Sequence, residues 1–188
     1  MDNKSKIIET ALKLFSEKGY EAVGVQEIVE QIRITKPTLY YYFGSKLGLF
    51  QEIIKQKSDD FISRLKVEAV YKGDLPLILN NITRLYFDFA NNNKEYYRML
   101  LGMSFGPPES EASQEVLKLF EKQFDIINNL FIECVKDHGN MRDRNFAYTI
   151  TFIGMINNYI TLFFHGYIKL NDEILYKAVH QFMHGIFS

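Results

Sequence analysis

The sequence contains little cysteine and almost no net charge. Its 188 residues include one cysteine, Cys134, so no internal disulfide can form and a reducing compartment, the cytoplasm, is expected. The 22 Lys and Arg residues are balanced by 23 Asp and Glu residues, which gives a net charge of −1. This balance excludes a protein that is basic throughout and coats nucleic acid by bulk charge, but not a local basic patch. A hydrophobic content of 47% excludes a largely disordered chain.

The sequence also lacks any alternating strand pattern of useful length, any internal repeat and any secretory signal. Apolar residues recur instead at three- and four-residue spacing, which is typical of amphipathic helices. We therefore expect an all-α protein. The expected helices cover residues 4–18, 25–31, 36–43, 46–71, 75–91, 94–105, 113–136, 143–167 and 172–187.

One segment, residues 145–168, has no Asp, Glu, Lys or Arg over 24 residues. That is long enough to cross a bilayer, which takes about 20 residues. The segment contains Asn145, Asn157, Asn158 and His165, however, and the sequence has no second segment of this kind. We expect a helix that is buried in a protein core or a subunit interface, with a membrane span as the alternative.

A short helix, a turn and a second short helix at residues 25–43 have the proportions of a helix-turn-helix unit. Thr35 is a good N-cap for the second helix, and Pro37 is tolerated in its first turn. The second helix of such a unit can enter the DNA major groove with its N-terminal residues at base edges. Leu39 and Phe43, four residues apart, can anchor this helix to a core. The residues left for its other surfaces are Lys36, Pro37, Thr38, Tyr41 and Tyr42.

The charge of this region favours a polyanionic partner. Residues 31–57 contain five basic residues and one acidic residue, Glu52, so this stretch carries +4 and the rest of the chain −5. Lys36 can donate to guanine O6 and N7, and Pro37 can touch a thymine methyl group. Lys46 follows the cap residue Ser45, so its charge and the helix N-terminus can address the same DNA phosphate.

Residues 7–50, IIETALKLFSEKGYEAVGVQEIVEQIRITKPTLYYYFGSKLGLF, resemble the tetracycline-repressor (TetR) family of bacterial transcriptional regulators. The FGSK sequence after the second helix is especially specific. The resemblance implies homodimers of all-α subunits, with a three-helix DNA-binding domain (here residues 1–48) and a helical ligand-binding and dimerisation domain (residues 49–188). It further implies a repressor that a small-molecule effector releases from a pseudo-palindromic double-stranded DNA operator. No enzymatic activity, cofactor, metal or membrane association is expected.

The resemblance carries the family's DNA contacts onto Gln26, Lys36, Pro37, Thr38, Tyr40, Tyr41, Tyr42 and Lys46. Among the three tyrosines, Tyr40 is expected to be partly structural. Two positions depart from the family's pattern. Gly24 stands where the family has a Ser or Thr cap, and it offers no side-chain oxygen. Arg33 stands where the family has glycine, so either Arg33 adopts a positive φ at a cost of roughly 1 kcal/mol or the turn differs.

The C-terminal part carries no recognisable motif, but aromatic residues and methionines are frequent on its apolar stripes. We therefore expect a mainly apolar ligand. The expected ligand-binding residues are Tyr86, Phe89, Tyr96, Met99, Met103, Phe105, Phe124, Asn128, Phe152, Met155 and Tyr159. The cluster of Tyr96, Tyr97, Met99, Met103 and Phe105 is equally consistent with ordinary core. The expected polar anchors are Asn128, Asn129, Asn157 and Asn158, because an amide on an apolar helix needs a hydrogen-bond partner.

The dimer is expected to form through the last two long helices, because each subunit alone would expose a large apolar patch. Two such helices from each subunit can close a four-helix bundle. The expected interface residues are Ala147, Ile150, Gly154, Asn158, Thr161, Ala178, Phe182 and Ile186.

Several single residues have both a structural and a functional interpretation. His180 and His184 are spaced for zinc, but without further ligands no metal site is expected. Arg84 and Asp88 are expected to form a surface ion pair, with a counter-ion role for Asp88 as the alternative. Cys134 is expected to be a buried apolar residue, and Phe87, which lies off the apolar stripe of its helix, is expected to pack against a further element or a ligand.

Catalytic motifs are absent as well: the sequence has no G-x-S-x-G, no Walker loop, no Rossmann glycine run and no HExxH. Two alternatives to a DNA-binding regulator stay open. One is a helical ligand carrier or enzyme that uses the helix-turn-helix only for packing, and the other is a membrane-anchored helical protein.

Overall fold

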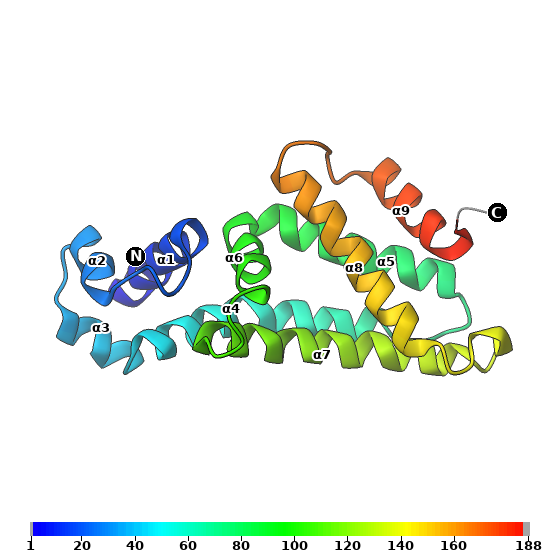
Figure 1. Cartoon of the computed structure of the whole chain (residues 1–188), viewed down its shortest axis with the longest axis horizontal. Helices are drawn as coiled ribbons and strands as arrows, with labels where there is room; N and C mark the ends of the chain where they lie inside the picture. The colour runs from blue at the N-terminus through cyan, green and yellow to red at the C-terminus, as the bar shows by residue number, and fades with distance from the viewer. Residues whose placement is uncertain (1, 186–188) are drawn as a thin grey trace. The chain divides into compact units, whose positions relative to one another are not determined.

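The computed structural model describes residues 2–185, and this part of the chain is all-α, as predicted (Figure 1). It contains nine α-helices, one short 3-10 turn at Gly139–Met141 and no strand. The helices are α1 (Asn3–Lys18), α2 (Val25–Gln31), α3 (Lys36–Phe43), α4 (Lys46–Glu68), α5 (Leu75–Asn92), α6 (Lys94–Ser104), α7 (Glu111–Cys134), α8 (Asn145–Phe164) and α9 (Asp172–His184).

The chain forms two compact units. The first joins the residues up to Asp60 with Asn93–Leu119, and the second joins Phe61–Asn92 with the residues from Phe120 onward. The long helices α4 and α7 each contribute residues to both units.

In the first unit, α1 packs against α2, α3 and α6. The Asp2 carboxylate accepts a hydrogen bond from the Ser5 amide (2.8 Å) and starts α1, and Gly19 ends it with a φ of 83°. The rings of Phe15, Tyr20 and Phe50 pack with centroids 5.1–5.8 Å apart. This aromatic cluster joins the end of α1 to the first turns of α4.

In the second unit, α5 packs against α8 and α9, and Figure 1 shows α8 crossing α5. The Tyr86 hydroxyl donates to the Gln123 side-chain oxygen (2.8 Å) in the buried interior. Phe87 is buried with its ring 6.5 Å from that of Tyr159 on α8, so the prediction that it packs against a further element is confirmed.

Two expectations for the second unit are wrong. The helix that begins at Lys46 ends at Glu68 and not at Tyr71, and the residues that follow leave the helix, so that the Tyr71 hydroxyl can donate to Asp137 (2.8 Å). Arg84 pairs with Asp172 at 2.6 Å instead of with Asp88, because the N-terminus of α9 brings a second carboxylate within its reach.

The charge-free helix α8 is buried on one side only. Its buried residues are Thr149, Phe152, Ile156 and Ile160, whereas Phe146 is 62% exposed and Ile150 is 50% exposed on its outer side. Of the two expected environments, the core of its own chain accounts for one side of this helix, and burial of the other side in a subunit interface stays a prediction. Among the described residues, α8 is the one helix whose length and composition would suit a membrane span.

Candidate nucleic-acid interface

Helices α2 and α3 form the predicted helix-turn-helix unit. Ile28 and Val29 of α2 and Leu39 of α3 are buried and hold the two helices in the first unit. In the turn between them, Arg33 has a φ of 56°, and the Ile34 amide donates to the Val29 carbonyl (3.0 Å). Of the two alternatives for this turn, the positive φ is therefore the one that occurs.

The opposite side of α3 is open to solvent. Lys36, Pro37 and the three consecutive tyrosines are all exposed, and Tyr41 is 84% exposed. Such a large ring, left almost uncovered by its own chain, is available to a partner. Thr38 is half-buried, and its hydroxyl lies 3.0 Å from that of the cap residue Thr35.

The start of α2 contributes a further exposed amide. Gly24 caps α2 through its backbone alone, without a side-chain hydrogen bond, as its residue type predicts. Gln26 is exposed in the first turn, and its side-chain amide donates to the carboxylate of Glu30. An amide group at this place can donate to a phosphate, since protein contacts to the DNA backbone commonly use such side chains.

A sharp turn of the backbone connects α3 to α4. Gly44 has a φ of 71° and ends α3, and the Ser45 hydroxyl then accepts a hydrogen bond from the Gly48 amide (2.9 Å), which confirms Ser45 as the cap of α4. A Cβ on Gly48 would lie 2.1 Å from the Phe43 carbonyl oxygen. The FGSK segment therefore turns the chain in two residues and sets the N-terminus of α4 directly beside the end of α3.

Lys46 lies against the protein instead of extending into solvent. Its Nζ is 4.0 Å from the centroid of the Tyr20 ring, and burial lowers the pKa of its ammonium group. A lysine over a ring face keeps its charge and gains a cation–π interaction. Since an ammonium has three donors, this pose still leaves donors for a phosphate.

The single acidic residue of the basic stretch is neutralised within the first unit. The Glu52 carboxylate accepts from Lys4 Nζ (2.7 Å) and from the Gln56 amide (2.9 Å), and these hydrogen bonds, that of Lys4 first, lower the pKa of Glu52. The basic residues of this region are therefore not offset by a free carboxylate within it.

The predicted ligand-binding residues divide between the two units. Tyr96, Met99 and Met103 are buried in the first unit, where α6 packs on α1, and Phe105 is 91% exposed. The other seven residues, Tyr86, Phe89, Phe124, Asn128, Phe152, Met155 and Tyr159, belong to the second unit. Tyr96, Met99 and Met103 thus contribute to the core of the first unit, and ligand binding by the eleven residues stays a prediction.

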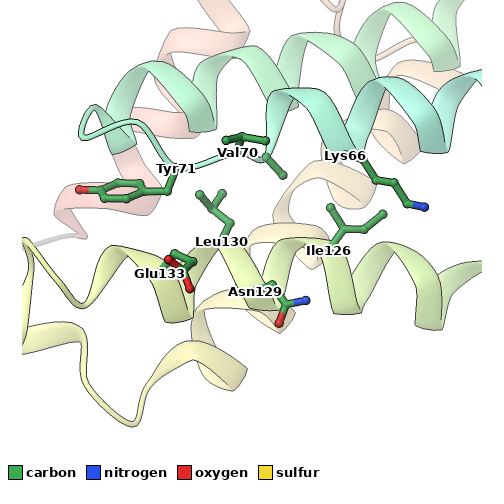
Figure 2. Close-up of a pocket in the computed structure, with 8 residues that line it drawn as sticks. Lys66, Val70, Tyr71, Ile126, Asn129, Leu130 and Glu133 are labelled. Carbon is green, nitrogen blue, oxygen red and sulfur yellow. The ribbon is translucent and has the colours of Figure 1, made fainter.

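A groove of about 430 Å³ lies in the second unit, between the end of α4 and the second half of α7 (Figure 2). Its lining residues are Lys66, Ala69, Val70, Tyr71, Ile126, Asn129, Leu130 and Glu133. Figure 2 shows the side chains of Val70 and Leu130 pointing toward one another. The Tyr71 hydroxyl donates to Asp137, and partial burial together with this hydrogen bond raises the pKa of Tyr71 to about 12.

Of the four predicted asparagine anchors, only Asn129 lines this groove. Asn128 instead accepts from the Asn145 amide (2.7 Å) inside the second unit. The predicted ligand-binding residues do not include the α4 side of the groove, because helical spacing predicts Val70 and Tyr71 within a continuous helix. Their closeness to the helix-breaking Gly73 was the one available signal.

The predicted dimer residues also divide. Ala147, Ile150, Asn158 and Thr161 are exposed on α8 and Gly154 is half-buried there. On α9, by contrast, Ala178 is fully buried in its own chain, so a direct contact of its side chain with a second subunit is not supported. The Phe182 ring packs 5.1 Å from that of Phe152 within the chain. Ile186 lies outside the described residues.

His180, His184 and Cys134 were each considered above for a structural and a functional role. The His180 and His184 rings lie 4.4 Å apart, and the described residues contain no group of three or more His, Cys, Asp or Glu that could hold a metal. Cys134 is fully buried, as predicted, and burial raises the pKa of its thiol to about 12.

The anchored α2, the turn and the exposed α3 define a helix-turn-helix protein. Residues 7–53 match the model of the family described as "Bacterial regulatory proteins, tetR family". The match covers the helix-turn-helix unit and the helices beside it, and this N-terminal part of the chain is a member of that family.

Two curated relatives and one solved structure are similar to the chain. The transcriptional activator FasR of Mycolicibacterium smegmatis is 25% identical over 60% of this chain and 52% of its own length. The biofilm operon negative transcriptional regulator IcaR of Staphylococcus aureus is 28% identical over 63% of this chain and 70% of its own length. FadR of Bacillus subtilis, solved in complex with stearoyl-CoA, has a TM-score of 0.77 at 18% identity and covers 97% of this chain and 98% of that one. The chain thus spans about half the length of FasR, and the likeness to FadR is one of fold.

Proposed function

We propose that the chain is a cytoplasmic DNA-binding transcriptional regulator that acts as a repressor and is released from its operator by a small, mainly apolar ligand. The observation that carries this proposal is the two-sided character of α3. Leu39 anchors the helix, whereas Lys36, Pro37 and Tyr41 stand in solvent beside it. If α3 served only to pack against the core, three consecutive exposed tyrosines, Tyr40 to Tyr42, would not be expected on it.

The exposed residues of α3 fit the chemistry of a major groove. Lys36 at its first turn donates to guanine O6 and N7, and Pro37 contacts a thymine methyl group. The hydroxyl groups of Tyr41 and Tyr42 donate to phosphates, as does Lys46 from the start of α4. Gln26, Thr38 and Tyr40 complete the proposed contact set.

One helix-turn-helix unit fills one half-site, so a homodimer is needed to read a pseudo-palindromic operator whose half-sites lie about 34 Å apart. We assign DNA binding to residues 1–48, and ligand binding and dimerisation to residues 49–188. The outer side of α8, with Phe146, Ile150 and Leu162 exposed, supports a second copy as the partner, because soluble monomers avoid large apolar patches.

The groove between α4 and α7 is the proposed ligand site. Its apolar lining includes Ala69, Val70 and Leu130, and the exposed Asn129 offers an amide. The stearoyl-CoA complex of FadR supports a ligand with a long apolar part for this fold. A ligand that binds here changes DNA affinity only to the extent that it binds the DNA-bound and free states with different affinities.

The test starts from a pool of random-sequence 40-bp duplexes, from which the full chain is used to select its preferred sequence. We expect selection of an inverted repeat, binding of one dimer per duplex in sedimentation analysis and a dissociation constant that rises steeply with salt. Titration calorimetry with stearoyl-CoA and with decanoic acid, with and without the selected duplex, then tests release. A chain that enriches no sequence from the pool would leave the ligand carrier or enzyme as the better interpretation, and identical ligand affinities with and without duplex would refute the coupling.

A further inference from the structure

We propose that Arg33, in the turn between α2 and α3, binds a DNA phosphate beside the groove that α3 occupies, and that the chain retains a strained backbone there for the sake of this contact. The inference rests on the proposed DNA binding and adds to it a residue from outside the recognition helix. Arg33 stands at the position where the family's pattern, as given above, has glycine.

The backbone at Arg33 is held in the left-handed region by its neighbours. Its φ is 56°, its amide donates to the Glu30 carbonyl (3.2 Å), and the next amide, that of Ile34, donates to the Val29 carbonyl (3.0 Å). An L-residue in this conformation brings its Cβ too close to backbone oxygen, a cost that glycine does not have.

Only one other non-glycine residue in the described part of the chain has a positive φ, and it is Asp143. Aspartate tolerates this region because its short side chain hydrogen-bonds locally, whereas arginine has no such compensation. Strain that a chain keeps although a simpler residue would remove it points to a role for the side chain.

The Arg33 side chain is available for such a role. It is exposed, and among residues 2–185 its guanidinium takes part in none of the ion pairs. The nearest carboxylate along the chain, that of Glu30, accepts a hydrogen bond from Gln26. The guanidinium therefore keeps its five donors for a partner outside the chain.

The position of Arg33 matches a phosphate that flanks the groove. Arg33 and Lys36 are three positions apart in the chain, so their Cα atoms lie within about 11 Å of one another. The major groove is about 12 Å wide, so a long side chain on a turn this close to base-contacting residues can reach the phosphates that flank the groove. A guanidinium can bind a phosphate through two parallel hydrogen bonds.

The test compares Arg33→Asn, Arg33→Gly and Arg33→Lys with the parent chain on the selected 40-bp duplex, by fluorescence anisotropy between 50 and 200 mM salt. We expect Arg33→Asn and Arg33→Gly to weaken binding about tenfold near 0.1 M salt and to reduce the slope of log K against log salt by about 0.9 per half-site. Arg33→Lys should keep the slope, because it keeps the charge, and lose part of the affinity. Arg142→Asn, which removes an exposed arginine of the second unit, is the matched control and should change neither quantity.

Thermal unfolding of the same variants separates this role from a structural one. We expect Arg33→Asn to melt at an unchanged or higher temperature than the parent chain, because asparagine tolerates the left-handed region. Unchanged affinity and slope in Arg33→Asn, with the parent chain binding its duplex, would overturn the inference and leave DNA binding intact. A parent chain that binds no duplex selectively would instead refute the proposed function.

Discussion

The junction between α3 and α4 gives a prediction whose sign is opposite to the ordinary expectation. Replacing a glycine inside a helix with alanine normally stabilises a protein by about 0.5–1 kcal/mol. At Gly48, however, a Cβ would lie 2.1 Å from the Phe43 carbonyl oxygen, more than about 1 Å short of an ordinary non-bonded contact. The obstructing atom belongs to the backbone, so no side-chain rotation can relieve the clash.

We expect Gly48→Ala to lower the free energy of unfolding by about 1–3 kcal/mol. Overpacking at a site that cannot relax costs about this much, and displacement of the first turn of α4 would also weaken the Ser45 cap, which is worth about 1 kcal/mol. These costs outweigh the helix propensity that alanine contributes.

Denaturant unfolding of the full chain measures the effect, with Gly102→Ala as the control. Gly102 lies within α6 and is exposed, and no neighbouring atom lies within 4 Å of the place that a Cβ would take there. Its replacement should stabilise the chain by about 0.5–1 kcal/mol. If Gly48→Ala stabilised the chain to the same extent, the close approach of α4 to the Phe43 carbonyl would be disproved.

Three further predictions concern DNA contact, pH and assembly. Lys46→Ala should weaken binding to all duplexes alike, whereas Lys36→Ala should also relax base preference by about 1–3 kcal/mol, as competition among variant duplexes would measure; equal losses on all sequences for both variants would contradict the assignment of Lys36 to a base. Lys4→Met should destabilise the chain by about 0.2–1 kcal/mol at pH 7, and because the folded-state pKa of Glu52 is lowered from its ordinary value of 4.5, this difference should shrink as the pH falls from 4.5 through the lowered pKa; a difference that stayed constant over an acid titration would mean that Lys4 acts through packing. Gly154→Arg should yield monomer or aggregate in gel filtration, because no atom of the same chain lies within 4 Å of a Cβ there and the added charge would meet the second subunit; an unaltered dimer would refute the α8 interface.

Local signals made most of the fold predictable from the sequence. The Ser45 hydroxyl accepts a hydrogen bond from the backbone amide three residues later, which is the geometry that a cap residue predicts. The departure at Arg33 was also visible, since a residue other than glycine in a tight turn must adopt a positive φ or change the turn. In these cases the interacting groups lie within a few residues of one another.

The errors involve partners that lie far apart in the sequence. Tyr71 bonds to Asp137, 66 residues away, and Arg84 pairs with Asp172, 88 residues away. Helical spacing predicts Asp88 as the partner of Arg84. The partner that Arg84 contacts, Asp172, comes within reach only because α9 packs on α5. The buried residues of α6 illustrate the same limit, because periodicity identifies the apolar side of a helix but not what covers that side.

The composition of the outer side of α8 does not by itself decide whether a lipid or a protein covers it. Phe146, Ile150 and Leu162 are exposed there, but so is Asn158. An amide side chain facing hydrocarbon would lack a hydrogen-bond partner at a cost of several kcal/mol, whereas a protein surface can supply one. A second copy of the chain, the proposed partner, would offer polar side chains and backbone groups that can pair with this amide. The mixed chemistry of this side therefore favours a protein partner over a bilayer.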